Sequence, residues 1–129
     1  MKYVFFGGQE SEFAQIILDR LIKAGKKPLA EIRNSKLPLD EDYLKSLNAD
    51  FFLVAAFAKI LKKEILNISP IGPISPIRPI PIIGVHPSLL PKYRGASPIQ
   101  SVLLNDEKET GATLFLIDEK VDHGPILTT

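Results

Sequence analysis

Apolar and polar residues alternate along the chain with the two periods that distinguish helices from strands. A short apolar run at residues 3–6 ends at two glycines and is followed by apolar positions at helical spacing up to Gly25. Residues 3–25 therefore predict a strand, a turn and a helix. Short apolar runs predict further strands at residues 29–33, 51–57, 82–85, 113–117 and 126–128.

Three more helices are expected between these strands. Asp40 can cap one of them, and Ser97 followed by Pro98 is a favourable cap and first-turn pair for a helix through Leu104. Residues 62–68 also predict a helix. Because strands alternate with helices, the sequence predicts an α/β domain with a mostly parallel sheet.

A proline repeat interrupts this pattern. Residues 70–81 consist of four tandem tripeptides that each begin with Pro-Ile. Proline at every third position favours polyproline II and excludes a helix or a central strand. We interpret residues 69–83 as an extended connector within the domain. The alternative is a ligand for a proline-recognising module, which no aromatic or basic flank supports.

Composition narrows the functional classes. The 129 residues are 45% hydrophobic, which fits one globular domain over residues 1–129. A net charge of +1, from 16 basic and 15 acidic residues, gives no overall field for nucleic acid or a membrane surface. The chain has no cysteine, which fits a reducing cytoplasm, and no run near the ~20 apolar residues of a membrane span.

The turn after the first strand invites a dinucleotide-binding interpretation. Its sequence GGQESE lacks the GxGxxG spacing and places Glu10 and Glu12 where a pyrophosphate needs positive potential. A nucleotide cofactor is therefore not expected. Gly7 and Gly8 form a tight turn or line a substrate cleft at the carboxyl end of the sheet.

His86 is the main candidate for chemistry. It follows a predicted inner strand, at the end of an α/β sheet where ligands bind. Taken alone, a histidine there is as readily a structural residue. Asp122 lies in a predicted turn between two later strands, from which it can reach the same end of the sheet and hold an imidazole.

Two blocks of sequence carry a resemblance to a known family. GVHPSLLPKYRGASPIQ at residues 84–100 and ETGATLFLIDEKVDHGPIL at residues 109–127 resemble the 10-formyltetrahydrofolate-dependent formyltransferases. Within that family the likeness is greatest to the branch that acts on methionyl-tRNA. The likeness extends more weakly to residues 5–25 and 47–68, but not to the proline repeat.

The resemblance implies a Rossmann-like, three-layer fold and a formyl transfer from 10-formyltetrahydrofolate to an amine, without a metal. His86 and Asp122 match the family's catalytic histidine and aspartate, and residues 57–61 match a further wall of the folate cleft. The acceptor expected is initiator methionyl-tRNA, in translation initiation, with an amino sugar nucleotide or glycinamide ribonucleotide as alternatives. No obligate protein partner is evident. The family's folate-binding loop falls on Ser88, Leu89, Leu90 and Pro91.

The chain also departs from the family. Gly84 stands where the family has an asparagine whose amide donates to the oxyanion. Loss of one such donor costs about 10²- to 10³-fold in rate, so a catalytically impaired folate-binding relic is a second interpretation. We expect the family's C-terminal tRNA-binding domain to be absent, and the last strand to leave an exposed apolar edge.

Four residues near His86 and Asp122 are expected to have supporting or structural roles. His123 is expected to be an exposed loop residue. Arg94 contacts either a substrate phosphate or an acidic neighbour, and Tyr93 is expected to pack. Gly124 is expected to permit the turn that presents Asp122.

Overall fold

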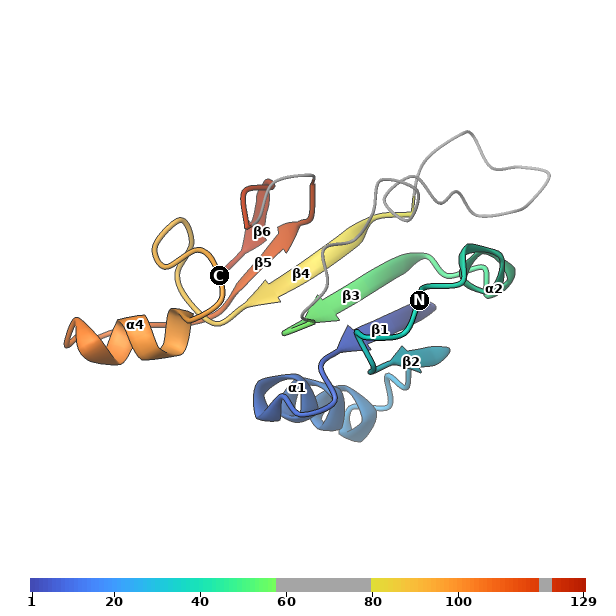
Figure 1. The fold of residues 1–129 in the computed structure, drawn as a ribbon, viewed down its shortest axis with the longest axis horizontal. Helices are drawn as coiled ribbons and strands as arrows, with labels where there is room; N and C mark the ends of the chain where they lie inside the picture. Colours follow the sequence, from blue (N-terminus) through green and yellow to red (C-terminus); the bar gives the residue numbers. More distant parts are fainter. Residues whose placement is uncertain (58–79, 119–121) are drawn as a thin grey trace. The chain divides into compact units, whose positions relative to one another are not determined.

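The computed structural model of the chain describes residues 1–57, 80–118 and 122–129 (Figure 1). These residues form two compact units, residues 1–82 and residues 83–129. Each unit is described by itself.

The N-terminal unit is built on a parallel sheet. Its central strand β1 (Tyr3–Gly7) pairs in parallel with β2 (Ala30–Ile32) and with β3 (Phe51–Ala55) (Figure 1). Every residue of β1 is buried, as expected for a strand covered on both faces. The fully buried aromatic side chains of the unit are Phe5, Phe6 and Phe52.

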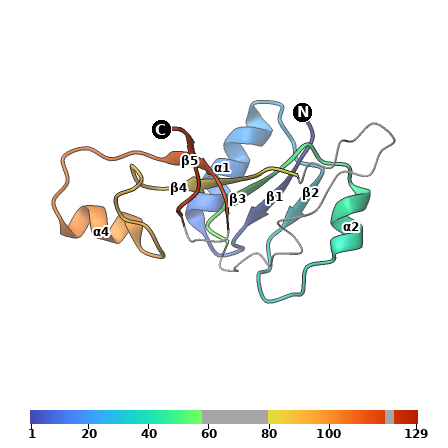
Figure 2. The same ribbon diagram turned by 90° about the horizontal axis from the view of Figure 1, so that it is seen from above.

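Two capped helices connect these strands. Helix α1 (Glu12–Lys23) begins where the Ser11 hydroxyl accepts a hydrogen bond from the Ala14 N–H at 3.1 Å, and it contacts β1 and β3 (Figure 2). Helix α2 (Glu41–Ser46) begins at Asp40, whose carboxylate accepts from the Tyr43 N–H at 3.1 Å. Both caps satisfy N–H groups that lack a partner within the helix.

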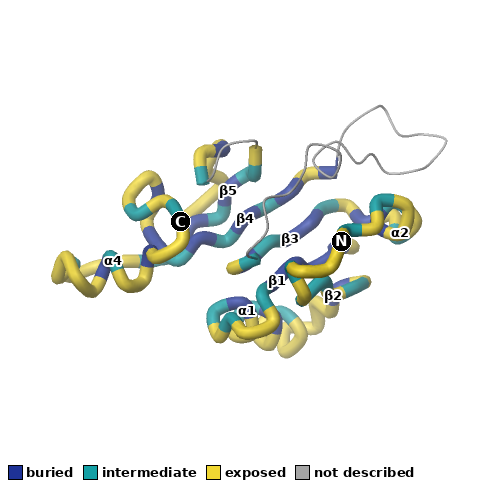
Figure 3. Tube along the Cα trace, in the orientation of Figure 1, coloured by how far each residue is buried: buried dark blue, intermediate teal, exposed yellow. Residues whose placement is uncertain are grey.

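The C-terminal unit is antiparallel. Strand β4 (Ile82–His86) begins at the boundary between the units, and β5 (Thr113–Leu116) pairs antiparallel with β4 and with β6 (Ile126–Thr128). Helix α4 (Pro98–Leu104) buries only Pro98 and Val102. The tube of Figure 3 shows buried positions concentrated on β4 and β5, whereas every residue of β6 is exposed.

Most predicted elements are present within one or two residues of their expected ends. Ser97 is the N-cap residue of α4 and Pro98 lies in its first turn, as predicted, although the Ser97 side chain makes no capping hydrogen bond. Proline suits the first turn of a helix because it has no N–H, and an N–H there would lack a partner within the helix. The predicted helix at residues 62–68 and most of the proline repeat, residues 69–79, lie outside the described residues. No helix of the described residues is long and apolar enough to cross a membrane.

The buried aromatic residues of the N-terminal unit should dominate its stability. Phe52 has no exposed surface, so Phe52→Ala should lower the free energy of unfolding by about 3–5 kcal/mol. Urea unfolding followed by circular dichroism measures this. Ile16→Ala is the control, because Ile16 is 54% exposed and should change the value by no more than about 0.5 kcal/mol. Equal effects of the two substitutions would contradict the packing described.

Candidate active site

His86 is the last residue of β4 and lies almost wholly inside the C-terminal unit. The residue is 5% exposed and pairs across the sheet with Thr113 on β5. Its Nε2 lies 2.7 Å from the backbone carbonyl oxygen of Tyr93. Because a carbonyl can only accept, Nε2 carries a proton and donates it to this hydrogen bond.

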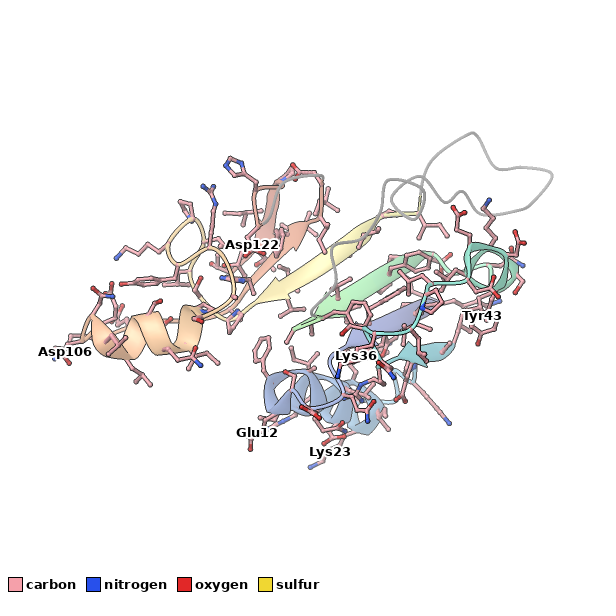
Figure 4. The ribbon with its side chains drawn as sticks, in the orientation of Figure 1. Glu12, Lys23, Lys36, Tyr43, Asp106 and Asp122 are labelled. Carbon is pink, nitrogen blue, oxygen red and sulfur yellow. The ribbon has the colours of Figure 1, made fainter. Side chains whose placement is uncertain are left out.

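Asp122 meets His86 from the segment between β5 and β6 (labelled in Figure 4). Its Oδ2 lies 3.5 Å from His86 Nδ1, the nitrogen on the other side of the ring from the Tyr93 carbonyl. The side chains are 7% and 16% exposed for His86 and Asp122 respectively. The two candidate residues are thus brought together by the fold, although 35 residues separate them in the chain.

Two hydrogen bonds from neighbouring residues hold Asp122 in place. Gly95 N–H donates to the same oxygen, Oδ2, at 2.8 Å, and Arg94 Nε donates to the Asp122 carbonyl at 3.1 Å. Gly124 follows closely, and a Cβ there would lie 1.6 Å from the Leu116 carbonyl oxygen. The expected backbone role of Gly124 therefore rests on a close approach that only glycine allows.

Both nitrogens of the His86 ring face oxygen atoms that accept hydrogen bonds. A neutral imidazole with its proton on Nε2 satisfies the Tyr93 carbonyl, whereas an imidazolium would also present an Nδ1 proton to the Asp122 carboxylate. The arrangement can therefore hold a proton on the ring and exchange it with a group that replaces either oxygen.

The loop after His86 is fixed by buried polar contacts. Thr113 Oγ1 donates to the Ser88 carbonyl at 2.7 Å and accepts from the Leu90 N–H at 3.0 Å. The Ser88 hydroxyl donates to the Lys92 carbonyl at 2.7 Å, and both hydroxyl residues are fully buried. Sequence reasoning missed Thr113, which it counted as an ordinary strand residue. The only signal is that Thr113 lies in the strand paired with His86.

The four residues of the predicted folate-binding loop differ in exposure. Ser88 and Leu90 are buried, whereas Leu89 is 41% exposed and Pro91 is exposed. The loop thus presents Leu89 and Pro91 to solvent, whereas the buried Ser88 hydroxyl hydrogen-bonds a backbone carbonyl of the loop itself. Of residues 57–61, only Phe57 lies within the described residues, in the N-terminal unit.

Tyr93 takes part through its side chain as well as its carbonyl. Its hydroxyl donates to Glu107 Oε1 at 2.6 Å, and Lys92 Nζ lies 3.3 Å from the same oxygen. The hydrogen bond from Tyr93, with Lys92 beside it, holds the pKa of Glu107 below its ordinary value. The same hydrogen bond, with burial and the Glu107 charge, raises the pKa of Tyr93.

Gly84 faces the ring of Phe115, its partner across the β4–β5 ladder. A Cβ at Gly84 would lie 2.6 Å from both Cε1 and Cζ of that ring, and 3.2 Å from Ile117 Cγ1. Phe115 is 3% exposed. Position 84 lies on the same face of β4 as His86, so an aromatic ring fills the space where an amide side chain would start.

A separate cavity of about 390 Å³ lies in the N-terminal unit, where Gln9, Arg33 and Tyr43 are among its lining residues. The Arg33 guanidinium donates to the carbonyls of Gly7 and Gly8, at 2.7 and 3.2 Å. The glycine turn is therefore packed against Arg33. Among the described residues, no group of three histidine, aspartate or glutamate side chains could hold a metal ion.

Comparison with known proteins now assigns the family. The formyl transferase family model matches residues 26–129, which is most of the chain. The chain belongs to this family. A methionyl-tRNA formyltransferase from Thermodesulfovibrio yellowstonii is 55% identical over 84 residues, which cover 65% of this chain and 24% of the relative. One from Helicobacter pylori is 45% identical over 100 residues, covering 78% of this chain and 29% of the relative.

Solved structures, two formyltransferases among them, share the fold. Methionyl-tRNA formyltransferase from Clostridium thermocellum matches with a TM-score of 0.70 and 21% identity, covering 98% of this chain and 51% of that one. Phosphoribosylglycinamide formyltransferase from Streptococcus pneumoniae matches with a TM-score of 0.64 and 19% identity, over 98% and 79% of the two chains. HypX from Aquifex aeolicus, solved with tetrahydrofolic acid, gives 0.71 and 15%, over 98% and 20%.

The expected fold class is confirmed by these matches: the chain has the α/β, Rossmann-like fold of the formyltransferases. Its strands are parallel in the N-terminal unit and antiparallel in the C-terminal unit. The resemblance to the formyltransferase family is confirmed as well. The chain spans about a quarter of the length of the curated relatives it matches, 24% in the first case.

The Tyr93–Glu107 contact should be visible as a titration. In Glu107→Gln, the pKa of Tyr93 should fall toward its ordinary value, because the charged acceptor is lost. An NMR titration of the Tyr93 ring carbons measures this, and Asp106→Asn, whose carboxylate is 87% exposed, is the control. Since folding lowers the pKa of Glu107, its contribution to stability is present above about pH 4.3 and is lost as pH falls further. An unchanged Tyr93 titration in Glu107→Gln would contradict the contact.

Substitutions at Gly84 and Phe115 should be coupled. Gly84→Asn alone should lower the free energy of unfolding by about 1–3 kcal/mol, because the new side chain overlaps a buried ring. Combined with Phe115→Ala, the loss should be smaller than the sum of the two single losses, by about 0.5–3 kcal/mol. Denaturant unfolding of the four proteins measures this coupling.

The control for that cycle pairs Gly84→Asn with Leu104→Ala. Leu104 is 87% exposed, so its substitution should add to that of Gly84→Asn within about 0.5 kcal/mol. Strict additivity of the Gly84 and Phe115 substitutions would show that the ring does not occupy the space beside Gly84.

Proposed function

We propose that the chain carries the catalytic pair of a formyltransferase, which moves a formyl group from 10-formyltetrahydrofolate to an amine. The observation that carries this proposal is the 3.5 Å separation of His86 Nδ1 and Asp122 Oδ2 at the end of β4. Family membership supplies the reaction class, and the tetrahydrofolic acid bound to the similarly folded HypX supports the folate donor.

The reaction needs a proton donor and a proton acceptor in one place. The acceptor nitrogen attacks the formyl carbon, and negative charge develops on the formyl oxygen of the tetrahedral intermediate. The bond from the formyl carbon to the folate nitrogen then breaks. Overall the attacking nitrogen loses one proton and the folate nitrogen gains one. An imidazolium at His86 stabilises the oxyanion, and Asp122 stabilises the imidazolium and helps remove the proton through water.

The contact of His86 with Tyr93 sets a requirement on this mechanism. In the chain without substrate, the Nε2 proton is donated to the Tyr93 carbonyl at 2.7 Å. The formyl oxygen must therefore replace this carbonyl as the acceptor of the Nε2 proton. The Tyr93 backbone is left-handed, with φ of 58°, which is uncommon for a residue with a large side chain.

The acceptor we propose is the amino group of methionyl-tRNA, as in the names of the curated relatives. A glycinamide ribonucleotide is the alternative that the fold of phosphoribosylglycinamide formyltransferase supports. We place the protein in the cytoplasm, where these acceptors occur, with folate and tRNA as its partners.

A second candidate is a folate-binding protein with little turnover. The observation that favours it is the Phe115 ring beside Gly84, which leaves no space for an amide donor at position 84. With one oxyanion donor missing, the rate is expected to be about 10²- to 10³-fold lower than with a complete site.

The test is formyl transfer from 10-formyltetrahydrofolate to methionyl-tRNA, glycinamide ribonucleotide and an amino sugar nucleotide in parallel. The parent chain should form one formylated product and release tetrahydrofolate in equal amount. His86→Ala should lower the rate by about 10²- to 10⁴-fold, because the imidazole that stabilises the oxyanion by donating a proton is removed. His123→Ala is the matched control, because the exposed His123 should leave the rate unchanged.

Each outcome decides between the two candidates. Equal rates in the parent and in His86→Ala would remove His86 from the mechanism. Folate binding without turnover on any acceptor would overturn the proposed formyl transfer and favour the second candidate, a folate-binding protein.

A further inference from the structure

Two consecutive residues, Arg94 and Gly95, contact Asp122 at two different points. The Arg94 Nε donates to the backbone carbonyl of Asp122 at 3.1 Å. The Gly95 N–H donates to the side-chain oxygen Oδ2 at 2.8 Å. One contact therefore holds the backbone of Asp122, and the other holds its carboxylate.

The oxygen held by Gly95 is the one that faces His86. Asp122 Oδ2 accepts the Gly95 hydrogen bond and lies 3.5 Å from His86 Nδ1. A carboxylate on a single Cβ can rotate and turn its oxygens away, and a hydrogen bond to a fixed backbone N–H removes this freedom. The contact thus selects the rotation in which Oδ2 points to the imidazole.

The backbone of Asp122 is in a conformation that depends on surrounding contacts. It has a left-handed conformation, with φ of 50°, in the segment between β5 and β6. Such a conformation persists where surrounding contacts hold it. Arg94 is exposed, so its guanidinium reaches Asp122 along the surface of the C-terminal unit.

We propose that Arg94 and Gly95 are positioning residues for the His86–Asp122 pair. This inference rests on the proposed function for its kinetic consequence, whereas its structural consequence stands without it. Of the two expectations for Arg94, the proposal favours contact with its acidic neighbour, since Nε donates to the backbone carbonyl of Asp122.

The structural test follows the ring nitrogens of His86 by NMR. Introducing His123→Gln in every variant leaves His86 as the one remaining histidine, since the chain has two. The change in ¹⁵N chemical shifts caused by Asp122→Asn defines the signal of the Asp122 carboxylate. Arg94→Ala should reproduce most of that change, and Arg94→Lys, which keeps a cationic donor, should restore most of the parent shifts.

Lys108→Ala is the control for loss of a positive charge. Lys108 is 81% exposed and pairs with Asp106, so the His86 shifts should stay as in the parent. Parent-like shifts in Arg94→Ala would overturn the role of Arg94, whether or not the chain transfers formyl groups.

Gly95 is tested against a glycine of the same backbone type. Gly95 and Gly25 have φ of 98° and 75°, and a Cβ at either would meet nothing within 4 Å. Gly95→Ala and Gly25→Ala therefore introduce a similar backbone strain. Gly95→Ala should shift the His86 signals, because its N–H moves from Asp122, whereas Gly25→Ala should leave them unchanged. Equal behaviour of the two variants would overturn the role of Gly95.

The kinetic test separates positioning from substrate binding. Arg94→Ala should lower kcat by about 10- to 100-fold with little change in KM for the acceptor, because a displaced catalytic group slows the chemical step. A raised KM for the acceptor with unchanged kcat would overturn the proposal and return Arg94 to phosphate binding. If the parent chain has no activity, the proposed function fails, and the NMR result alone decides the positioning role.

Discussion

One carboxylate oxygen, Oδ2 of Asp122, joins three segments of the C-terminal unit. Asp122 Oδ2 accepts the Gly95 N–H at 2.8 Å and lies 3.5 Å from His86 Nδ1. These groups come from the end of β4, the turn that follows it and the segment after β5. Each of the three segments must hold its place for the oxygen to meet both partners, which is why so many backbone contacts surround a pair of side chains.

The loop between His86 and Gly95 meets this requirement through buried hydrogen bonds. Thr113 stands opposite His86 in the sheet and bonds two loop residues, and the Ser88 hydroxyl closes the loop on the Lys92 carbonyl. Hydrogen bonds in a buried setting are costly to break, because the released group has no water to replace its partner. The loop is thus fixed near the strand, while its outer residues Leu89 and Pro91 remain at the surface.

The sequence was sufficient to predict the alternation of strands and helices, because apolar spacing reports which face of an element is buried. It also predicted that the turn before β6 brings Asp122 to His86, since both lie at the ends of predicted strands. It could not predict the contacts of the Tyr93 carbonyl and the Gly95 N–H, because every residue has these groups and only the folded backbone directs them. It predicted Ser97 as the N-cap of α4 but not that the side chain makes no hydrogen bond there, because residue type indicates a donor or acceptor, whereas the backbone conformation decides whether the side chain reaches the helix.

The aromatic ring beside Gly84 limits the substitutions that the β4–β5 ladder can accept. A side chain at position 84 overlaps Phe115, which is buried and has little space to retreat. A larger residue at position 84 is therefore accommodated better when residue 115 is smaller than phenylalanine, which makes the residue tolerated at one strand depend on its neighbour across the ladder.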